Sequence, residues 1–270
     1  MPRLSLGHGV EMHYEERGSG PLVVIASYWS MHPSALEPLT AELVSDHRVV
    51  RYDDRGTGQS TRTGPYDLAT SSGDLAALLR ELGEPAVIVG VADGPARAVR
   101  VAAEHPELVA GIVCPAGAPI GRANFAGGDA LATSEAVVDA LLQQIETDYR
   151  GALRGLVGPT NLQMSEDELR ARIAAQAEHV PVEAGAPRLR AWASDDPIDF
   201  ARAAGPKLWV LVTEAQTGGW FPVGAELAEV VRRLLPDANV AEVADGWVSR
   251  PDETAAVVRR ITAKGPVPVS

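Results

Sequence analysis

The sequence predicts an α/β fold in which a mostly parallel, doubly wound sheet is interrupted by a helical segment. Short continuous apolar runs alternate with helical patterns in the first third of the chain and again near its end. Such runs are typical of strands buried on both faces, and their alternation with helices predicts a parallel sheet. Residues 122–196 carry helical periodicity without convincing strands. We therefore expect one core built from residues 1–121 and 197–270, with residues 122–196 as a helical insertion.

The first half of the chain is expected to supply four strands and two helices. In the segment DLAALLRELG, four leucines recur at i, i+3, i+4 and i+7, which places them on one helix face. Gly83 follows as a helix stop. The strands are expected at 22–26, 47–52, 86–90 and 109–114, and the second helix at 94–104.

The inserted segment and the last third complete the pattern. The segments SEAVVDALLQQIETDY and SEDELRARIAAQAEH both open with capping signals of the Ser-x-x-Glu type, so each should begin a helix. After them we expect strands at 207–213 and 238–243, and helices at 227–234 and 252–263.

Composition limits the function classes. With 24 basic and 36 acidic residues the net charge is −12, which argues against nucleic acid or an anionic membrane as a partner. Cys114 is the only cysteine, so no intrachain disulfide can form. Neither a signal peptide nor an apolar run of about 20 residues is present, which predicts a cytoplasmic protein. We expect it to be a monomer or a homodimer. Because no metal-ligand spacing or phosphate-binding loop occurs, we expect no cofactor and no metal.

Three motifs resemble the α/β-hydrolase superfamily. The segment YDDRGTGQS matches that family's D-x-R-G-x-G-x-S loop, and HPELVAGIV is similar to its link into the following strand. GVADG, residues 90–94, has the spacing of the G-x-S-x-G nucleophile elbow, where small residues relieve a strained bend. The resemblance covers nearly the whole chain. It implies the α/β-hydrolase fold, with residues 122–196 as the cap.

The family's Ser-His-Asp triad does not carry over. Ala92 stands at the nucleophile position, Thr217 or Gly218 at the acid, and Trp247 at the histidine. A serine mechanism needs all three groups, so the sequence predicts that the triad is missing. One alternative is that Ala92 replaces the serine of a working hydrolase, but this would leave the other two positions unexplained.

The oxyanion hole is partly backbone, so it can survive these losses. The resemblance implies that the N–H groups of Asp93 and Trp29 are the two donors, and that they would polarise a carbonyl. The positive end of the helix beginning near Gly94 would add to this field. The alternative is that both groups are merely solvated.

Aromatic residues gather in the loops expected around the elbow. In doubly wound sheets these loops lie at the carboxyl ends of the strands, where ligands bind. Stacked rings favour a flat or polyene-like apolar ligand, although the rings could instead plug an unused cavity or pack under the cap. The expected substrate-binding residues are Ser27, Tyr28, Trp29, Ala92, Trp220, Phe221 and Trp247.

Asp93 and His32 are the candidate catalytic side chains. Asp93 adjoins the elbow and could exchange a proton with a bound group, or it could simply stabilise the helix N-terminus. His32 closely follows Tyr28 and Trp29, in what we call the oxyanion loop, and histidine titrates near neutral pH, although loop histidines are often only solvated. Asp53 and Arg55 are expected to tie their own loop together, while Asp54 could face either the pocket or solvent.

Three functions remain open on this basis. We predict a cofactor-independent, non-hydrolytic enzyme, either a cyclase, an isomerase or a lyase, acting on an apolar carbonyl compound of secondary metabolism. The alternatives are a catalytically inactive ligand-binding or scaffold protein, and a hydrolase that uses displaced residues.

Overall fold

The computed structural model describes residues 2–121, 131–157, 164–213, 224–245 and 250–263. Its centre is an eight-stranded sheet in the order β1-β2-β4-β3-β5-β6-β7-β8. The first two strands pair antiparallel with each other, β2 is also antiparallel to β4, and all other pairings are parallel. The strands are β1 Arg3–Gly7, β2 Val10–Arg17, β3 Leu22–Ala26, β4 Arg48–Tyr52, β5 Ala86–Val91, β6 Val109–Ala116, β7 Leu208–Val212 and β8 Asn239–Glu242.

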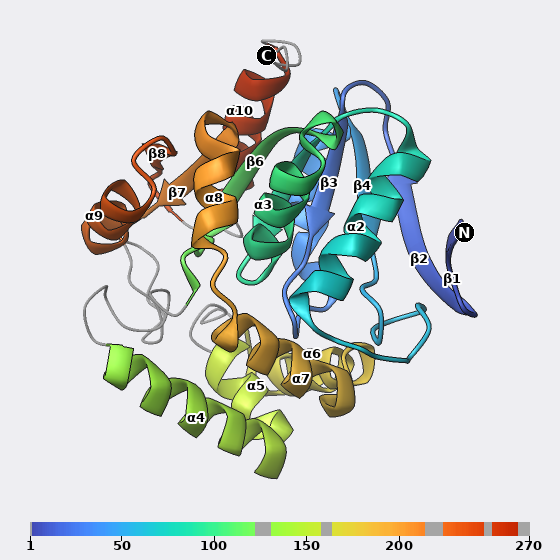
Figure 1. Cartoon of the computed structure of the whole chain (residues 1–270). Helices are drawn as coiled ribbons and strands as arrows, with labels where there is room; N and C mark the ends of the chain where they lie inside the picture. Colours follow the sequence, from blue (N-terminus) through green and yellow to red (C-terminus); the bar gives the residue numbers. More distant parts are fainter. Residues whose placement is uncertain (1, 122–130, 158–163, 214–223, 246–249, 264–270) are drawn as a thin grey trace.

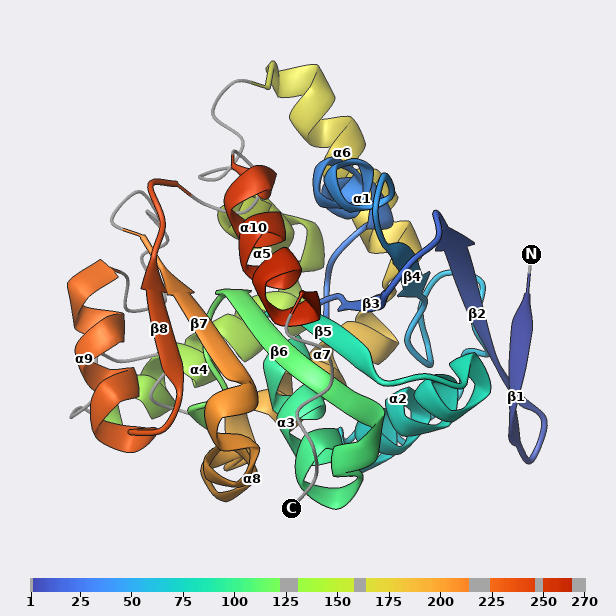
Figure 2. The same ribbon diagram turned by 90° about the horizontal axis from the view of Figure 1, so that it is seen from above.

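Helices cover both faces of this sheet. Figure 2 shows α1 and α10 on one face and α2, α3 and α8 on the other. Alternate residues of β3 supply both cores, because Val24 packs toward α2 and α3 while Val23 packs toward α1 and α10. These helices, with α9 beside β7 and β8, are α1 Glu37–Leu43, α2 Leu68–Leu82, α3 Gly94–Glu104, α8 Ile198–Ala204, α9 Gly224–Leu234 and α10 Pro251–Thr262.

Four further helices lie together beyond the carboxyl ends of the parallel strands (Figure 1). They are α4 Leu131–Thr147, α5 Tyr149–Val157, α6 Glu166–His179 and α7 Val182–Ser194, and we call them the cap helices. A third apolar cluster joins them to the core: Leu141 of α4 and Leu189 of α7 pack with Trp29 and Ala96. All four lie within residues 122–196, although the division into core and cap stays a prediction.

The predicted fold class is confirmed, and most predicted elements occur within two residues of their expected ends. Gly83 ends α2 in the left-handed conformation, at φ +78°, where glycine carries no steric penalty. A full capping box at Ser165 begins α6, as predicted. The predicted start of the first cap helix was wrong: α4 begins at Leu131, so Ser134 lies inside it. None of the described helices combines the length and apolar character needed to cross a bilayer.

Candidate active site

The predicted elbow forms between β5 and α3. Ala92 occupies its tip at φ +52°, a left-handed conformation that is uncommon for a residue with a side chain. Both flanking glycines are required by close approach: a Cβ at Gly94 would lie 2.5 Å from the Ala26 carbonyl oxygen, and one at Gly90 would lie 2.6 Å from the Pro95 nitrogen. The sharp bend that displays a nucleophile is therefore built, with a methyl group at its tip.

The two predicted oxyanion donors differ in the structure. The backbone N–H of Asp93 has no acceptor among the described residues. The N–H of Trp29 donates a 2.8 Å hydrogen bond to Oδ1 of Asp93. The predicted second donor is thus already engaged, because the side chain beside the elbow turns back toward the oxyanion loop.

Asp93 belongs to a buried network of two aspartates and two arginines. Arg188, from α7, donates to Oδ2 of Asp54 at 2.9 Å and to Oδ2 of Asp93 at 3.2 Å. Arg97, from α3, donates to Oδ1 of Asp54, to the Ser27 carbonyl and, at 3.2 Å, to the Tyr52 hydroxyl. Both arginine side chains are almost fully buried, at 0% and 3% exposure. The four charges cancel, which is the condition under which such groups are tolerated in a protein interior.

This network answers two questions left open by the sequence. Asp54 faces inward. Burial alone would raise the pKa of Asp54, but the guanidinium groups of Arg188 and Arg97 outweigh it and hold that pKa below its usual value. Both oxygens of Asp93 are also occupied, which disfavours its predicted role as a free general base.

His32 stands at the N-cap of a short 3₁₀ helix, Pro33–Leu36, where its Nδ1 accepts the Ser34 N–H at 3.2 Å. Its ring meets the ring of His179 edge to face, with centroids 5.3 Å apart. Burial, together with His179 and Arg172, lowers the pKa of His32, so the imidazole is neutral at neutral pH. The predicted catalytic histidine therefore lies beside a second histidine from the cap.

His179 is the functional candidate that the sequence analysis missed. It is the last residue of α6, and its Nε2 lies 3.3 Å from Oδ1 of Asp53. The other Asp53 oxygen, Oδ2, lies 3.1 Å from Nδ1 of His13 and accepts the Gln59 N–H at 2.9 Å. Burial lowers the pKa of His179, although Asp53 and Asp54 act in the opposite direction. Asp53 does tie its loop, as predicted, and in addition it contacts a cap histidine.

The backbone of the D-x-R-G loop also holds His179. The Gly58 N–H donates to the His179 carbonyl at 2.7 Å. Gly58 has φ +49°, and a Cβ there would lie 2.3 Å from Oδ2 of Asp53. Glycine at this position thus permits loop, carboxylate and cap histidine to meet. No local pattern links His179 to Asp53, since they lie far apart in the sequence.

A small cavity of about 140 Å³ opens beside this pair. Its lining includes His179, Asp53, His13 and Ser27. Ser27 directly follows β3 and Asp53 directly follows β4, so the cavity lies at the carboxyl ends of two parallel strands. This is where doubly wound sheets bind their ligands.

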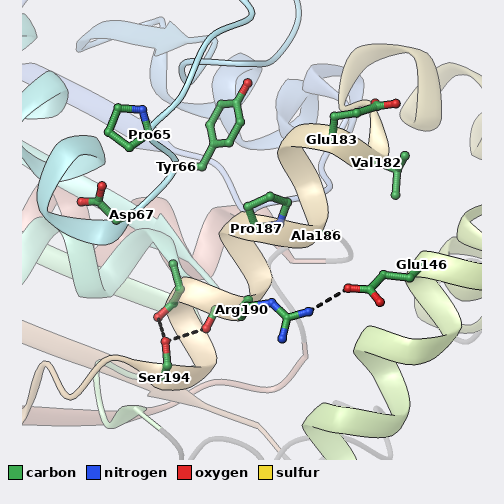
Figure 3. A pocket seen from close by; sticks show the side chains of 11 residues that line it. Pro65, Tyr66, Asp67, Glu146, Val182, Glu183, Ala186, Pro187, Arg190 and Ser194 are labelled. Carbon is green, nitrogen blue, oxygen red and sulfur yellow. Dashed lines mark hydrogen bonds and ion pairs between the residues drawn. The ribbon is translucent and has the colours of Figure 1, made fainter.

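A second cavity, of about 570 Å³, lies between α7 and the loop before α2. Figure 3 shows Tyr66 and Pro187 at its walls and the Arg190–Glu146 ion pair at one end. Neither Ala92 nor His179 is among its lining residues.

The expected aromatic pocket can be followed only in part. Trp29 is buried, and Tyr28 packs with Ala92 against the same cluster of cap residues. Burial raises the pKa of Tyr28, although Gln176 acts in the opposite direction. Of the interpretations given above, these two rings therefore fit the one in which the aromatic residues pack under the cap. The other expected members, Trp220, Phe221 and Trp247, lie outside the described residues, as do Thr217 and Gly218, so the absence of the triad stays a prediction.

Solved structures share this fold over nearly their whole length. An enol-lactonase from Burkholderia xenovorans LB400 superposes with a TM-score of 0.73 at 21% identity, covering 97% of this chain and 98% of that one. An esterase from Exiguobacterium antarcticum gives a TM-score of 0.78 at 19% identity, covering 94% and 96%. At such identities the likeness concerns the fold alone.

Sequence relatives are more similar over shorter stretches. A 2-(acetamidomethylene)succinate hydrolase of Mesorhizobium japonicum is 32% identical over 114 residues, which are 41% of this chain and 40% of that protein. A putative carbamate hydrolase, RutD, of Caulobacter vibrioides is 33% identical over 121 residues, covering 42% and 45%. The matched stretches therefore span less than half the length of these curated relatives.

These names contradict two of our interpretations. We predicted a non-hydrolytic cyclase, isomerase or lyase, with an inactive ligand-binding or scaffold protein as an alternative, whereas the named relatives are hydrolases. The inference failed because alanine at the elbow removes only the acyl-enzyme route. It does not prevent direct attack by water.

The family itself follows from a match that covers most of the chain. The model of the alpha/beta hydrolase family matches residues 8–257. This agrees with the strand order, the strained elbow and the helices inserted above it. The chain belongs to the alpha/beta hydrolase family.

Proposed function

We propose that this protein is a hydrolase that cleaves a small amide or carbamate, with His179 activating the attacking water in place of an elbow serine. The relatives are named for the hydrolysis of 2-(acetamidomethylene)succinate and of a carbamate, and we extend that chemical class to this chain. Ala92 offers no nucleophile, so water must attack the carbonyl carbon directly.

One observation carries the assignment: Nε2 of His179 lies 3.3 Å from Oδ1 of Asp53, beside a cavity of about 140 Å³. A carboxylate at Nε2 favours the tautomer with its proton on that nitrogen. The lone pair is then on Nδ1, which has no partner among the described residues. Because the pKa of His179 is lowered, this nitrogen is unprotonated at neutral pH and can accept a proton.

The reaction balances with these groups alone. The water oxygen bonds to the carbonyl carbon while its proton passes to Nδ1 of His179. The tetrahedral intermediate then breaks its C–N bond, and the imidazolium returns the proton to the leaving nitrogen. Asp53 stabilises the imidazolium between the two steps, as the acid does in other His–Asp pairs.

The cavity restricts the substrate. Its volume is near the roughly 150 Å³ that holds a benzene molecule in a well-studied engineered cavity, so the bound group should be small. Arg51, the arginine among its described lining residues, is already paired with Glu15 at 2.8 Å and Glu37 at 2.9 Å. We therefore expect an uncharged acyl or carbamoyl group rather than a free carboxylate.

The test is hydrolysis of p-nitroacetanilide and p-nitrophenyl N-methylcarbamate by the wild type and by His179→Gln. We expect turnover above buffer for the wild type and a loss in kcat of about 100-fold or more in the variant, the usual contribution of a general base. His105→Gln is the control, because His105 follows the last residue of α3 and so lies at the opposite ends of the strands from Asp53.

Three results would overturn the proposal. The first is turnover by His179→Gln at the wild-type rate, and the second is no turnover of any amide, carbamate or ester by the wild type. The third is stoichiometric labelling by a serine-directed fluorophosphonate, which would restore a serine mechanism.

A further inference from the structure

Two consecutive aspartates of the core each hold one side chain of the cap. Asp53 contacts His179, at the end of α6, and Asp54 accepts a hydrogen bond from Arg188, in α7. The cap partner is an imidazole in the first contact and a guanidinium in the second. The first pair is partly open to the cavity, with the His179 side chain 16% exposed, and the second is closed from solvent, with the Arg188 side chain 3% exposed.

The chain between His179 and α7 is short and is held at Val180. Only Val180 and Pro181 separate His179 from the first residue of α7. The Val180 carbonyl accepts a 2.8 Å hydrogen bond from the Tyr149 hydroxyl, on α5. A displacement of α7 from the core would therefore pull on the His179 backbone, against the 2.7 Å hydrogen bond that the Gly58 N–H donates to its carbonyl.

We propose that Arg188 is a positioning residue, which docks α7 on Asp54 and Asp93 and thereby places the His179 imidazole against Asp53. The inference rests on the proposed function of His179. A buried guanidinium without partners is strongly disfavoured. Arg188 therefore stays buried, and α7 stays docked on the core, only while Asp54 and Asp93 accept its hydrogen bonds. The dyad is complete only in the docked arrangement, because its two members come from the cap and the core.

Arg188 also acts on His179 through charge. The imidazole is surrounded by Asp53, Asp54, Arg62, Arg188 and His32. The positive charge of Arg188 lowers the pKa of His179, whereas Asp54 raises it. Removing Arg188 would leave Asp54 less neutralised, so the imidazole should protonate at a higher pH.

The matched comparison is Arg188→Met with Arg190→Met. Both arginines are on α7, but the Arg190 side chain is 59% exposed and pairs with Glu146 inside the cap. We expect Arg188→Met to lower kcat at least tenfold with little change in KM, and to move the acidic limb of kcat/KM to higher pH. Arg190→Met should change neither, and Arg188→Lys should recover part of kcat. If Arg188→Met does not fold, Arg188→Lys and Arg188→Gln carry the same comparison.

NMR titration of the His179 ring, without substrate, separates this inference from the proposed function. A higher His179 pKa in Arg188→Met than in the wild type supports the coupling of Arg188 to His179 even if His179→Gln retains activity. An unchanged His179 pKa together with an unchanged kcat would overturn it, as would equal effects from Arg190→Met.

Discussion

The elbow and the His179 site both lie at the carboxyl ends of the parallel strands, yet their charged groups differ in burial and pairing. Around the elbow, Asp54, Asp93, Arg97 and Arg188 are all buried and paired, and the tip itself is a methyl group. Around His179, the imidazoles of His32 and His179 are partly exposed and uncharged at neutral pH, and His179 lines a cavity. A salt-bridged carboxylate is a weak base, whereas a neutral imidazole is a good one. Under the proposed function, the comparison teaches that the backbone of the elbow persists while the reactive side chain comes from the cap.

The largest expected effect comes from breaking the charge balance at the elbow. Asp54→Asn would leave two buried guanidinium groups facing one carboxylate, and removing one partner of a buried pair costs about 3–5 kcal/mol. Urea unfolding should show this loss. Glu146→Gln, which removes the exposed partner of Arg190, should leave the unfolding midpoint almost unchanged. Equal midpoints for both variants would show that the buried network contributes no more than a surface pair.

The elbow backbone is the next point of contrast. Gly94→Ala places a Cβ 2.5 Å from the Ala26 carbonyl oxygen, and relieving that overlap should cost about 1–3 kcal/mol. Gly73→Ala is the matched control, because it adds the same methyl group to α2 with no atom within 4 Å. That change should stabilise the protein by about 0.5–1 kcal/mol. Urea unfolding should therefore give changes of opposite sign, and a stabilised Gly94→Ala variant would contradict the described elbow.

A smaller effect is expected at the elbow tip. Ala92→Gly removes the Cβ from a residue at φ +52°, where an L side chain is strained by about 1–2 kcal/mol. Part of this gain is offset by the greater freedom of glycine in the unfolded chain, so we expect a net stabilisation of at most about 1 kcal/mol. Thermal unfolding should show a small increase in Tm. A decrease would mean that the methyl contact with the cap cluster outweighs the strain.

The weakest effect should appear in the pH dependence of stability at the His179 site. His32 and His179 have pKa values lowered from 6.5 in the folded chain, so below that pH the unfolded chain binds more protons than the folded one. Stability from these groups is complete above pH 6.5 and is lost as the pH falls toward the lowered values. Urea unfolding between pH 8 and 5 should show this fall, and His32→Gln should make it shallower. An unchanged slope in that variant would contradict the burial of His32.

Local patterns in the sequence determined the elements and their order. Continuous apolar runs gave β3 and β5 because strands buried on both faces need apolar residues at every position. The glycines around Ala92 predicted the elbow because few other residues permit that bend. Gly83 and Ser165 marked helix ends by hydrogen bonds to residues three or four positions away. Each of these signals depends on neighbours in the chain, so it can be read without the fold.

Only the tertiary structure decided which charged groups meet. Arg97 and Arg188 each lie on a helix whose sequence gives no sign that the side chain is buried, and both become buried because Asp54 and Asp93 lie opposite them. His179 and Asp53 lie on different elements, and they come together only where the cap rests on the carboxyl ends of the strands. An electrostatic contact depends on distance in space, which local spacing along the chain does not encode.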